Sequence, residues 1–175
     1  MYANETLSKN KHGNITKILN ELLINEFTLY IKLGYYRSLT SEPNLLALKK
    51  KFEELSKDFI EAIDTIGKQI RSCGQKAYPT LARHLNYMDL ENRQDQQNIT
   101  SQEIIFDVLA DIENLIQNLE GHIEVSKDNK DYEDIQILLD GLLTTHYKQV
   151  IMLQGYLEKE SLDSLTEFMS TYCLL

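Results

Sequence analysis

Two carboxylates in one stretch of the chain are the best candidates for a chemical role, because their type and spacing suit metal binding. In LLALKKKFEELSKDFIEAIDTIGKQI, residues 45–70, Lys49 precedes Glu53 by four positions and Lys68 follows Asp64 by four. Carboxylate oxygens ligate divalent metal ions, whereas a lysine four residues away on a helix pairs with the carboxylate instead. The stretch is therefore compatible with a metal site or with two ion pairs.

The histidine spacing argues against a metal site inside a single helical bundle. Such a site needs Glu-x-x-His on two helices, so that a carboxylate and an imidazole share one face. The residue three before His84, His122 and His146 is a leucine each time, and His12 lies in a polar segment. We expect His146, in an otherwise apolar segment, to be a partly buried, hydrogen-bonded side chain, and His84 and His122 to lie at the surface.

Other catalytic classes find no support in the motifs. The chain has no nucleophile with an assembled base, no glycine-rich phosphate loop and no zinc spacing. Cys73 and Cys173 fit no C-x-x-C pattern, so both are expected to be plain thiols.

Composition points to a single soluble domain made of long helices. The 175 residues are 42% apolar and 26% charged, with only seven glycines and two prolines to make turns. The net charge of −9 argues against strong DNA binding, because that affinity comes from basic residues that neutralise phosphates. No apolar run approaches the roughly 18 residues of a membrane span and no secretory signal is visible, so we expect a cytoplasmic protein that does not contact membranes.

Apolar residues recur mostly three and four positions apart in four long segments, the pattern of amphipathic helices. Residues 1–14 are polar and are predicted to be a flexible tail. Pro43 breaks the first helix from the second, Gly74 suits the end of the second, and Thr100 or Ser101 can cap the third. The predicted helices span residues 15–38, 44–72, 101–126 and 132–159, with a short helix near Pro79 and a helical tail at 162–172.

These elements predict an all-α fold, a four-helix bundle forming one domain over residues 15–175. The connection between the second and third helices carries the short extra helix and is long enough to travel the length of the bundle. A crossover topology is therefore favoured over simple up-and-down winding.

Three quoted stretches carry a family resemblance. LNELLINEFTLYIKLGYYRS, then LLALKKKFEELSKDFIEAIDTIGKQIRSCG, then YPTLARHL, within residues 15–85, resemble the Dps (DNA-protection-during-starvation) family of the ferritin-like superfamily. The resemblance implies a ferritin-like four-helix bundle and a hollow homo-oligomeric shell, a dodecamer. It also implies an iron-oxidising site built between two subunits.

The family's site residues can be carried over position by position. The histidine near the end of the first helix falls on Arg37, and the histidine of the second helix falls on Lys49. The nearby carboxylate is Glu53 and the aspartate is Asp64, while the glutamate one turn later has become Lys68. The resemblance thus leaves Glu53 and Asp64 as residual metal ligands.

The three replacements alter the chemistry of the site. A charged guanidinium or ammonium has no lone pair to give a metal, so iron binding should be weak or absent and no cofactor is otherwise expected. We hypothesise that Lys49 and Lys68 pair with Glu53 and Asp64, and that Arg37 adds a third charge across a subunit boundary. The alternative, equally open, is that these are ordinary solvated helix pairs.

The resemblance implies a role in iron sequestration and oxidative-stress protection. Ferroxidase activity is expected of the family, but most ligands of that site are replaced here. The alternative is a non-catalytic structural or interaction protein that keeps the shell without metal chemistry. A third interpretation is co-assembly with an active paralogue.

Overall fold

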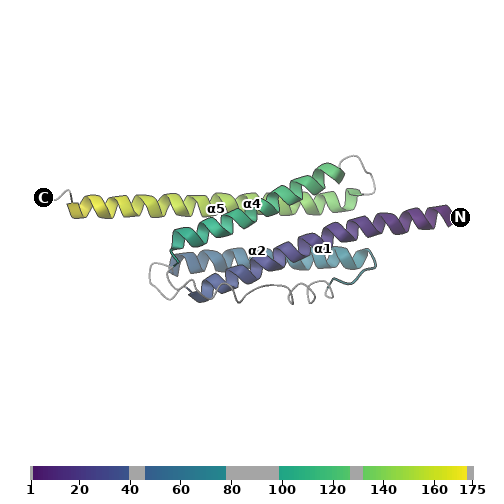
Figure 1. Ribbon diagram of the computed structural model, residues 1–175, viewed down its shortest axis with the longest axis horizontal. Helices are drawn as coiled ribbons and strands as arrows, with labels where there is room; N and C mark the ends of the chain where they lie inside the picture. Colours follow the sequence, from purple (N-terminus) through teal and green to yellow (C-terminus); the bar gives the residue numbers. More distant parts are fainter. Residues whose placement is uncertain (1, 40–45, 78–98, 127–131, 173–175) are drawn as a thin grey trace.

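The computed structural model describes residues 2–39, 46–77, 99–126 and 132–172, which form four long α-helices (Figure 1). All regular structure in these ranges is helical, which confirms the predicted all-α class. The helices are α1 (Tyr2–Leu39, 38 residues), α2 (Leu46–Ser72, 27 residues), α4 (Ser101–Ser126, 26 residues) and α5 (Glu133–Tyr172, 40 residues).

The helices form two antiparallel pairs, α1 with α2 and α4 with α5 (Figure 1). The pairs meet through contacts of α1 with α4 and of α2 with α5. Because α2 and α4 run in the same direction, the chain between Ala77 and Ile99 must join opposite ends of the bundle. This is the predicted crossover topology; the short helix expected near Pro79 falls outside the described residues.

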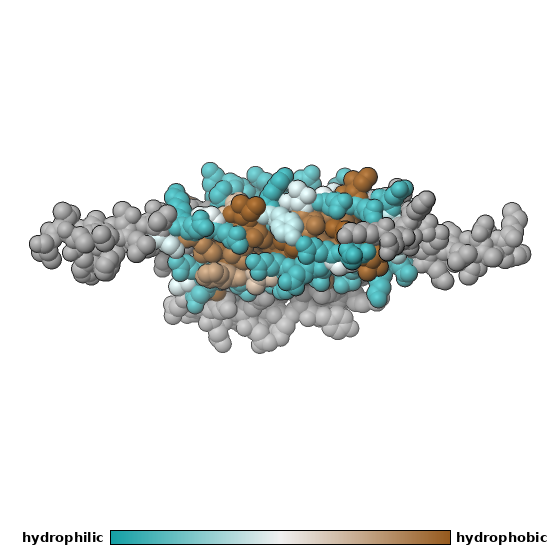
Figure 2. All heavy atoms as spheres, turned by 90° about the horizontal axis from the view of Figure 1, so that it is seen from above, coloured by the Kyte–Doolittle hydropathy of each residue, from teal (hydrophilic) through white to brown (hydrophobic). Residues whose placement is uncertain are grey.

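The core is built from the apolar side of each helix, as the three-and-four spacing predicts. Each of the four helices contributes side chains that are fully shielded from water, among them Leu19, Leu33, Phe52, Phe59, Ile66, Ile104, Ile112, Leu139 and Leu153. On the face seen in Figure 2, apolar residues gather along the middle of the bundle, with polar residues between and around them. None of the helices in the described ranges is apolar over enough of its length to cross a membrane.

Two helix ends are set by local sequence. Gly74 has a φ of +75°, and the amides of Gly74 and Gln75 donate to the carbonyls of Arg71 and Ile70 at 2.9 and 3.2 Å. This pair of hydrogen bonds is a Schellman motif, which satisfies the last carbonyls of α2. At the start of α4, the Thr100 amide donates to Glu103 at 2.8 Å and the Glu103 amide donates to the Thr100 hydroxyl at 3.2 Å, a capping box.

Two expectations differ from the structure. Residues 2–14, predicted to be a flexible tail, are part of α1, which begins at Tyr2. The helical tail expected at 162–172 is continuous with α5. No proline interrupts either segment. Once packing elsewhere has nucleated a helix, extending it by another polar residue costs little free energy.

Gly74→Ala and Gly121→Ala should shift stability in opposite directions. Alanine at residue 74 must adopt a left-handed backbone, which costs about 1 kcal/mol, whereas residue 121 lies within α4, where nothing is within 4 Å of an added Cβ. Gly121→Ala should therefore stabilise the protein by up to about 1 kcal/mol. Urea unfolding of the two variants and the wild type measures the difference, and equal shifts would contradict the assigned end of α2.

Candidate functional site

The five residues implied by the family resemblance lie at the end of α1 and along α2. Arg37 approaches Glu53, with Nη2 3.7 Å from Oε1, and Lys68 approaches Asp64, with Nζ 2.5 Å from Oδ2. The first pair joins α1 to α2, and the second joins adjacent turns of α2. Both residual carboxylates therefore have a cation beside them.

The ion pair at Glu53 differs from the predicted one. Lys49, predicted to pair with Glu53, forms no ion pair with any described residue; it is half-buried. Arg37 pairs with Glu53 within the one chain that the structure contains. The long Arg37 side chain reaches from the end of α1 to Glu53 on α2. The spacing of residues within one helix does not predict such a contact between two helices.

These residues do not fit a metal centre within one chain. Guanidinium and ammonium nitrogens donate hydrogen bonds and have no lone pair for a metal. Among the described residues, no three histidine, cysteine, aspartate or glutamate side chains are grouped closely enough to hold an ion. The arrangement balances the charge of the carboxylates with covalently attached cations.

A second polar group lies in the core, where sequence reasoning did not place one. Glu26 of α1 is completely buried, and its Oε1 is 2.8 Å from Nε2 of His146 on α5, also buried. The other oxygen, Oε2, has no hydrogen-bond partner. The His146 ring also stacks on Phe59, with centroids 5.7 Å apart. The prediction that His146 is hydrogen-bonded is confirmed, but the side chain, expected to be partly buried, is almost completely buried.

A chain of hydrogen bonds leads from this pair toward the surface of the bundle. Nδ1 of His146 is 2.9 Å from Oε1 of Gln149, and Nε2 of Gln149 donates to Oδ2 of Asp58 on α2 at 3.2 Å. Because the Asp58 carboxylate only accepts, the Gln149 amide is oriented with its oxygen toward His146. Both ring nitrogens thus face acceptors, which is the environment of a protonated imidazolium.

The pKa of His146 responds to these neighbours. Burial by itself lowers that pKa, but the hydrogen bond and charge of Glu26, the hydrogen bond to Gln149 and the charge of Asp58 together raise it above the ordinary value. A buried pair that satisfies a charge in this way contributes to stability only while both partners remain.

A third polar cluster joins α1 to α4. The Lys32 ammonium is buried and lies 2.6 Å from Oδ2 of Asp107, and it also pairs with Asp111. The Tyr36 hydroxyl donates to the same Asp107 carboxylate. The lysine occupies the space between the two aspartates, so this cluster is a structural ion-pair network rather than a vacant site for a cation.

One signal in the sequence could have revealed the buried pair. Glu26 falls on the apolar stripe of α1, four residues after Leu22 and three before Leu29, and His146 falls on the stripe of α5, four residues after Leu142. An acid on one apolar stripe and a base on another suggest mutual pairing, because neither is tolerated singly in a core.

Comparison with known proteins agrees with this architecture. Residues 16–162 match the model of the ferritin-like domain family. The DNA protection during starvation protein of Brevibacillus brevis is 28% identical over 147 residues, which cover 82% of this chain and 95% of that protein.

Solved structures give the same picture. The crystal structure of a Dps protein from Bacillus brevis superposes with a TM-score of 0.71 at 26% identity, covering 85% of this chain and 97% of that one. The Dps protein of Vibrio cholerae, described as a member of a broad superfamily of ferritin-like diiron-carboxylate proteins, has a TM-score of 0.72 at 20% identity, covering 85% and 91%. At that identity the second likeness supports the fold alone.

The buried pair predicts a pH dependence of stability. The pKa of folded His146 is raised above its ordinary value of about 6.5, so its contribution is fully present below pH 6.5 and is lost as the pH rises through the folded pKa. Glu26→Gln removes the charge, should lower the free energy of unfolding by about 3 kcal/mol at pH 6 and should flatten this dependence.

Denaturant unfolding from pH 5.5 to 8.5 measures both effects. His122→Gln is the matched control, because it removes a half-exposed histidine from α4 and leaves the buried pair intact. If Glu26→Gln kept the wild-type loss of stability between pH 6.5 and 8.5, His146 would not be its source.

Proposed function

Because this chain belongs to the ferritin-like domain family, in its Dps branch, we propose that it is a shell-forming protein of iron sequestration and oxidative-stress protection whose inter-subunit oxidation site is weak or lost. The family match spans most of the chain, and a relative named for DNA protection during starvation is 28% identical over 82% of it. The proposed assembly is a cytoplasmic homo-oligomer, a dodecamer.

One observation carries the proposal of a weakened site. Both acidic residues that remain at family ligand positions, Glu53 and Asp64, are next to a cation of their own chain, at 3.7 and 2.5 Å. A ferrous ion would have to displace Arg37 and Lys68 and would still meet their positive charge nearby. Lys49 adds a third cation at a position where the family has an imidazole.

Residual iron handling would then rest on carboxylates outside that site. The net charge of −9 favours accumulation of cations over anions at the surface. The same charge opposes binding to the DNA backbone, so we propose protection by sequestration rather than by DNA coating. Single exposed carboxylates bind iron weakly, because they supply only one ligand each.

The same ion pairs favour a second candidate function. A shell that needs no metal at its interfaces fits a structural subunit that co-assembles with an active paralogue. The two functions differ in whether particles of this chain alone take up iron.

Ferrous iron added to the purified protein should be oxidised little faster than in buffer. The expected reason is the absence of imidazole and paired carboxylates at the site, and absorbance of ferric iron follows the reaction. Light scattering of the same sample should give a particle of about twelve chains. Rapid oxidation would contradict the lost site, a monomer would contradict the shell, and particles that hold no iron would favour the structural candidate.

The triple variant Arg37→His, Lys49→His and Lys68→Glu should bind ferrous iron more tightly than the wild type, by at least about tenfold. It supplies two imidazoles and a carboxylate and removes three cations. Anaerobic titration calorimetry measures the affinity. The matched control, Lys50→His, Lys57→His and Lys76→Glu, introduces the same two imidazoles and one carboxylate, and removes three cations, at exposed positions outside the site. Equal gains in both variants would reject the assigned register.

A further inference from the structure

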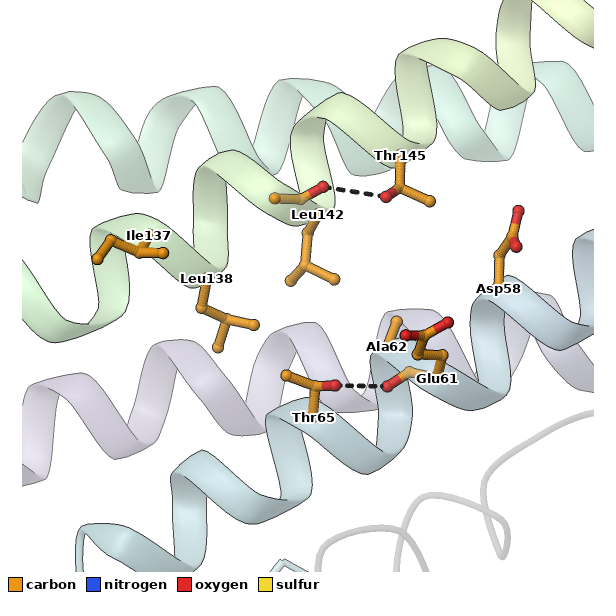
Figure 3. A pocket seen from close by; sticks show the side chains of 9 residues that line it. Asp58, Glu61, Ala62, Thr65, Ile137, Leu138, Leu142 and Thr145 are labelled. Atoms are coloured by element: carbon orange, nitrogen blue, oxygen red, sulfur yellow. Dashed lines mark hydrogen bonds between the residues drawn. The ribbon is translucent and has the colours of Figure 1, made fainter.

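An open groove of about 570 Å³ runs between α2 and α5 (Figure 3). Its size lies within the range of small-molecule sites in proteins. Ile137 lies at one end and Asp58 at the other, because the two helices are antiparallel. None of its lining residues is among the family ligand positions, so the groove is separate from the site described above.

The wall at one end of the groove is apolar. On α5, Leu142 is buried, Leu138 is half-buried, and Ile137 is 80% exposed. Covering this exposed isoleucine with an apolar group is favourable, by about 25 cal/mol per Å² of apolar surface removed from water. This end therefore favours a hydrocarbon or aromatic body.

The polar atoms of the groove are acceptors. The Thr65 hydroxyl donates to the Glu61 carbonyl at 2.8 Å, and the Thr145 hydroxyl donates to the Gly141 carbonyl at 3.0 Å. Each hydroxyl donates its hydrogen to a carbonyl of its own helix, so it can only accept hydrogen bonds from a ligand in the groove. The carboxylates of Asp58 and Glu61 add further acceptors.

The two carboxylates are also without a cation. Asp58 accepts a hydrogen bond from Gln149 at 3.2 Å, but neither it nor Glu61 forms an ion pair with any described residue. This contrasts with Glu53, Glu54 and Asp64 on the same helix, each of which has a cationic partner. A ligand that binds here must bring both the positive charge and the hydrogen-bond donors.

We propose that the groove binds a small organic cation, with a protonated amine at the Asp58 and Glu61 end and an apolar body against Ile137, Leu138 and Leu142. An ammonium supplies three donors to a lining that presents only acceptors. The apolar body replaces water at the exposed isoleucine. This binding is independent of iron and goes beyond the proposed sequestration.

Charge disfavours a twofold contact between two copies of the chain at this groove. A twofold contact through this groove would bring together the same patch from both copies, so the carboxylates of each would face those of the other. Like charges brought together and desolvated oppose such a contact. A metal ion is also disfavoured, because within the described ranges no third histidine, cysteine or acid is grouped with Asp58 and Glu61.

The hydrogen-bond chain connects the groove to the core. Asp58 is the surface end of the chain that passes through Gln149 to His146, and its negative charge helps to raise the pKa of His146. An ammonium on Asp58 cancels that charge. Ligand binding should therefore move the pH at which the buried pair loses its stabilisation to a lower value.

Three probes with the same eight-carbon chain test the proposal: octylammonium, 1-octanol and octanoate, each below its micelle concentration. Titration calorimetry on the intact assembly should rank octylammonium first, about tenfold tighter than octanol, with octanoate weakest. Equal affinities would overturn the role of the carboxylates, and no binding of octylammonium would overturn the site.

Paired variants separate charge from apolar contact. Asp58→Asn with Glu61→Gln should weaken octylammonium about tenfold and change octanol by less than about twofold. The matched control, Glu21→Gln with Glu113→Gln, removes two exposed acids from α1 and α4 and should change neither. A loss of octylammonium affinity in both double variants would show a general effect of net charge and overturn the proposal.

Ile137→Ser and the stability profile give independent readouts. Ile137→Ser should weaken octylammonium and octanol alike, without changing the particle mass by light scattering. A change in mass would identify the groove as an interface between copies and overturn the proposal. Octylammonium should also lower the pH midpoint of the His146-dependent stability loss, and an unmoved midpoint would place the ligand away from Asp58.

Discussion

An acid in an apolar core must either find a basic partner or give up its charge, and in this bundle that requirement links the first helix to the last. Glu26 meets it through His146, and Gln149 continues the contact to Asp58 on α2. Hydrogen bonds of this kind fix how far one helix is shifted along its axis relative to another. Apolar stripes alone allow several such positions. The Lys32 cluster does the same between α1 and α4.

Local sequence predicted the elements wherever a local interaction defines them. The bounds of α4 agree with the prediction at both ends, because the Thr100 and Glu103 capping box starts the helix. The end of α2 was predictable for the same kind of reason, since Gly74 tolerates the left-handed backbone. The start of α1 was not, because a polar helical extension has no apolar period to read and no cap to mark its first residue.

Contacts between helices were less predictable than contacts within them. The Asp64 and Lys68 pair follows from a spacing of four residues and was expected. The pairing of Arg37 with Glu53 instead of Lys49, and that of Glu26 with a histidine 120 residues away, depends on how the helices lie against each other. Periodicity identifies which side of a helix faces inward, but not which residues meet there.

The ion pairs of Glu53 and Asp64 neutralise these carboxylates with side chains of the same chain. A bound metal can be stripped by a chelator, exchanged for a competitor or lost when supply falls, whereas Arg37 and Lys68 are synthesised with the chain. The positive charge that balances Glu53 and Asp64 is consequently part of the polypeptide itself, present from synthesis and independent of any ion in solution.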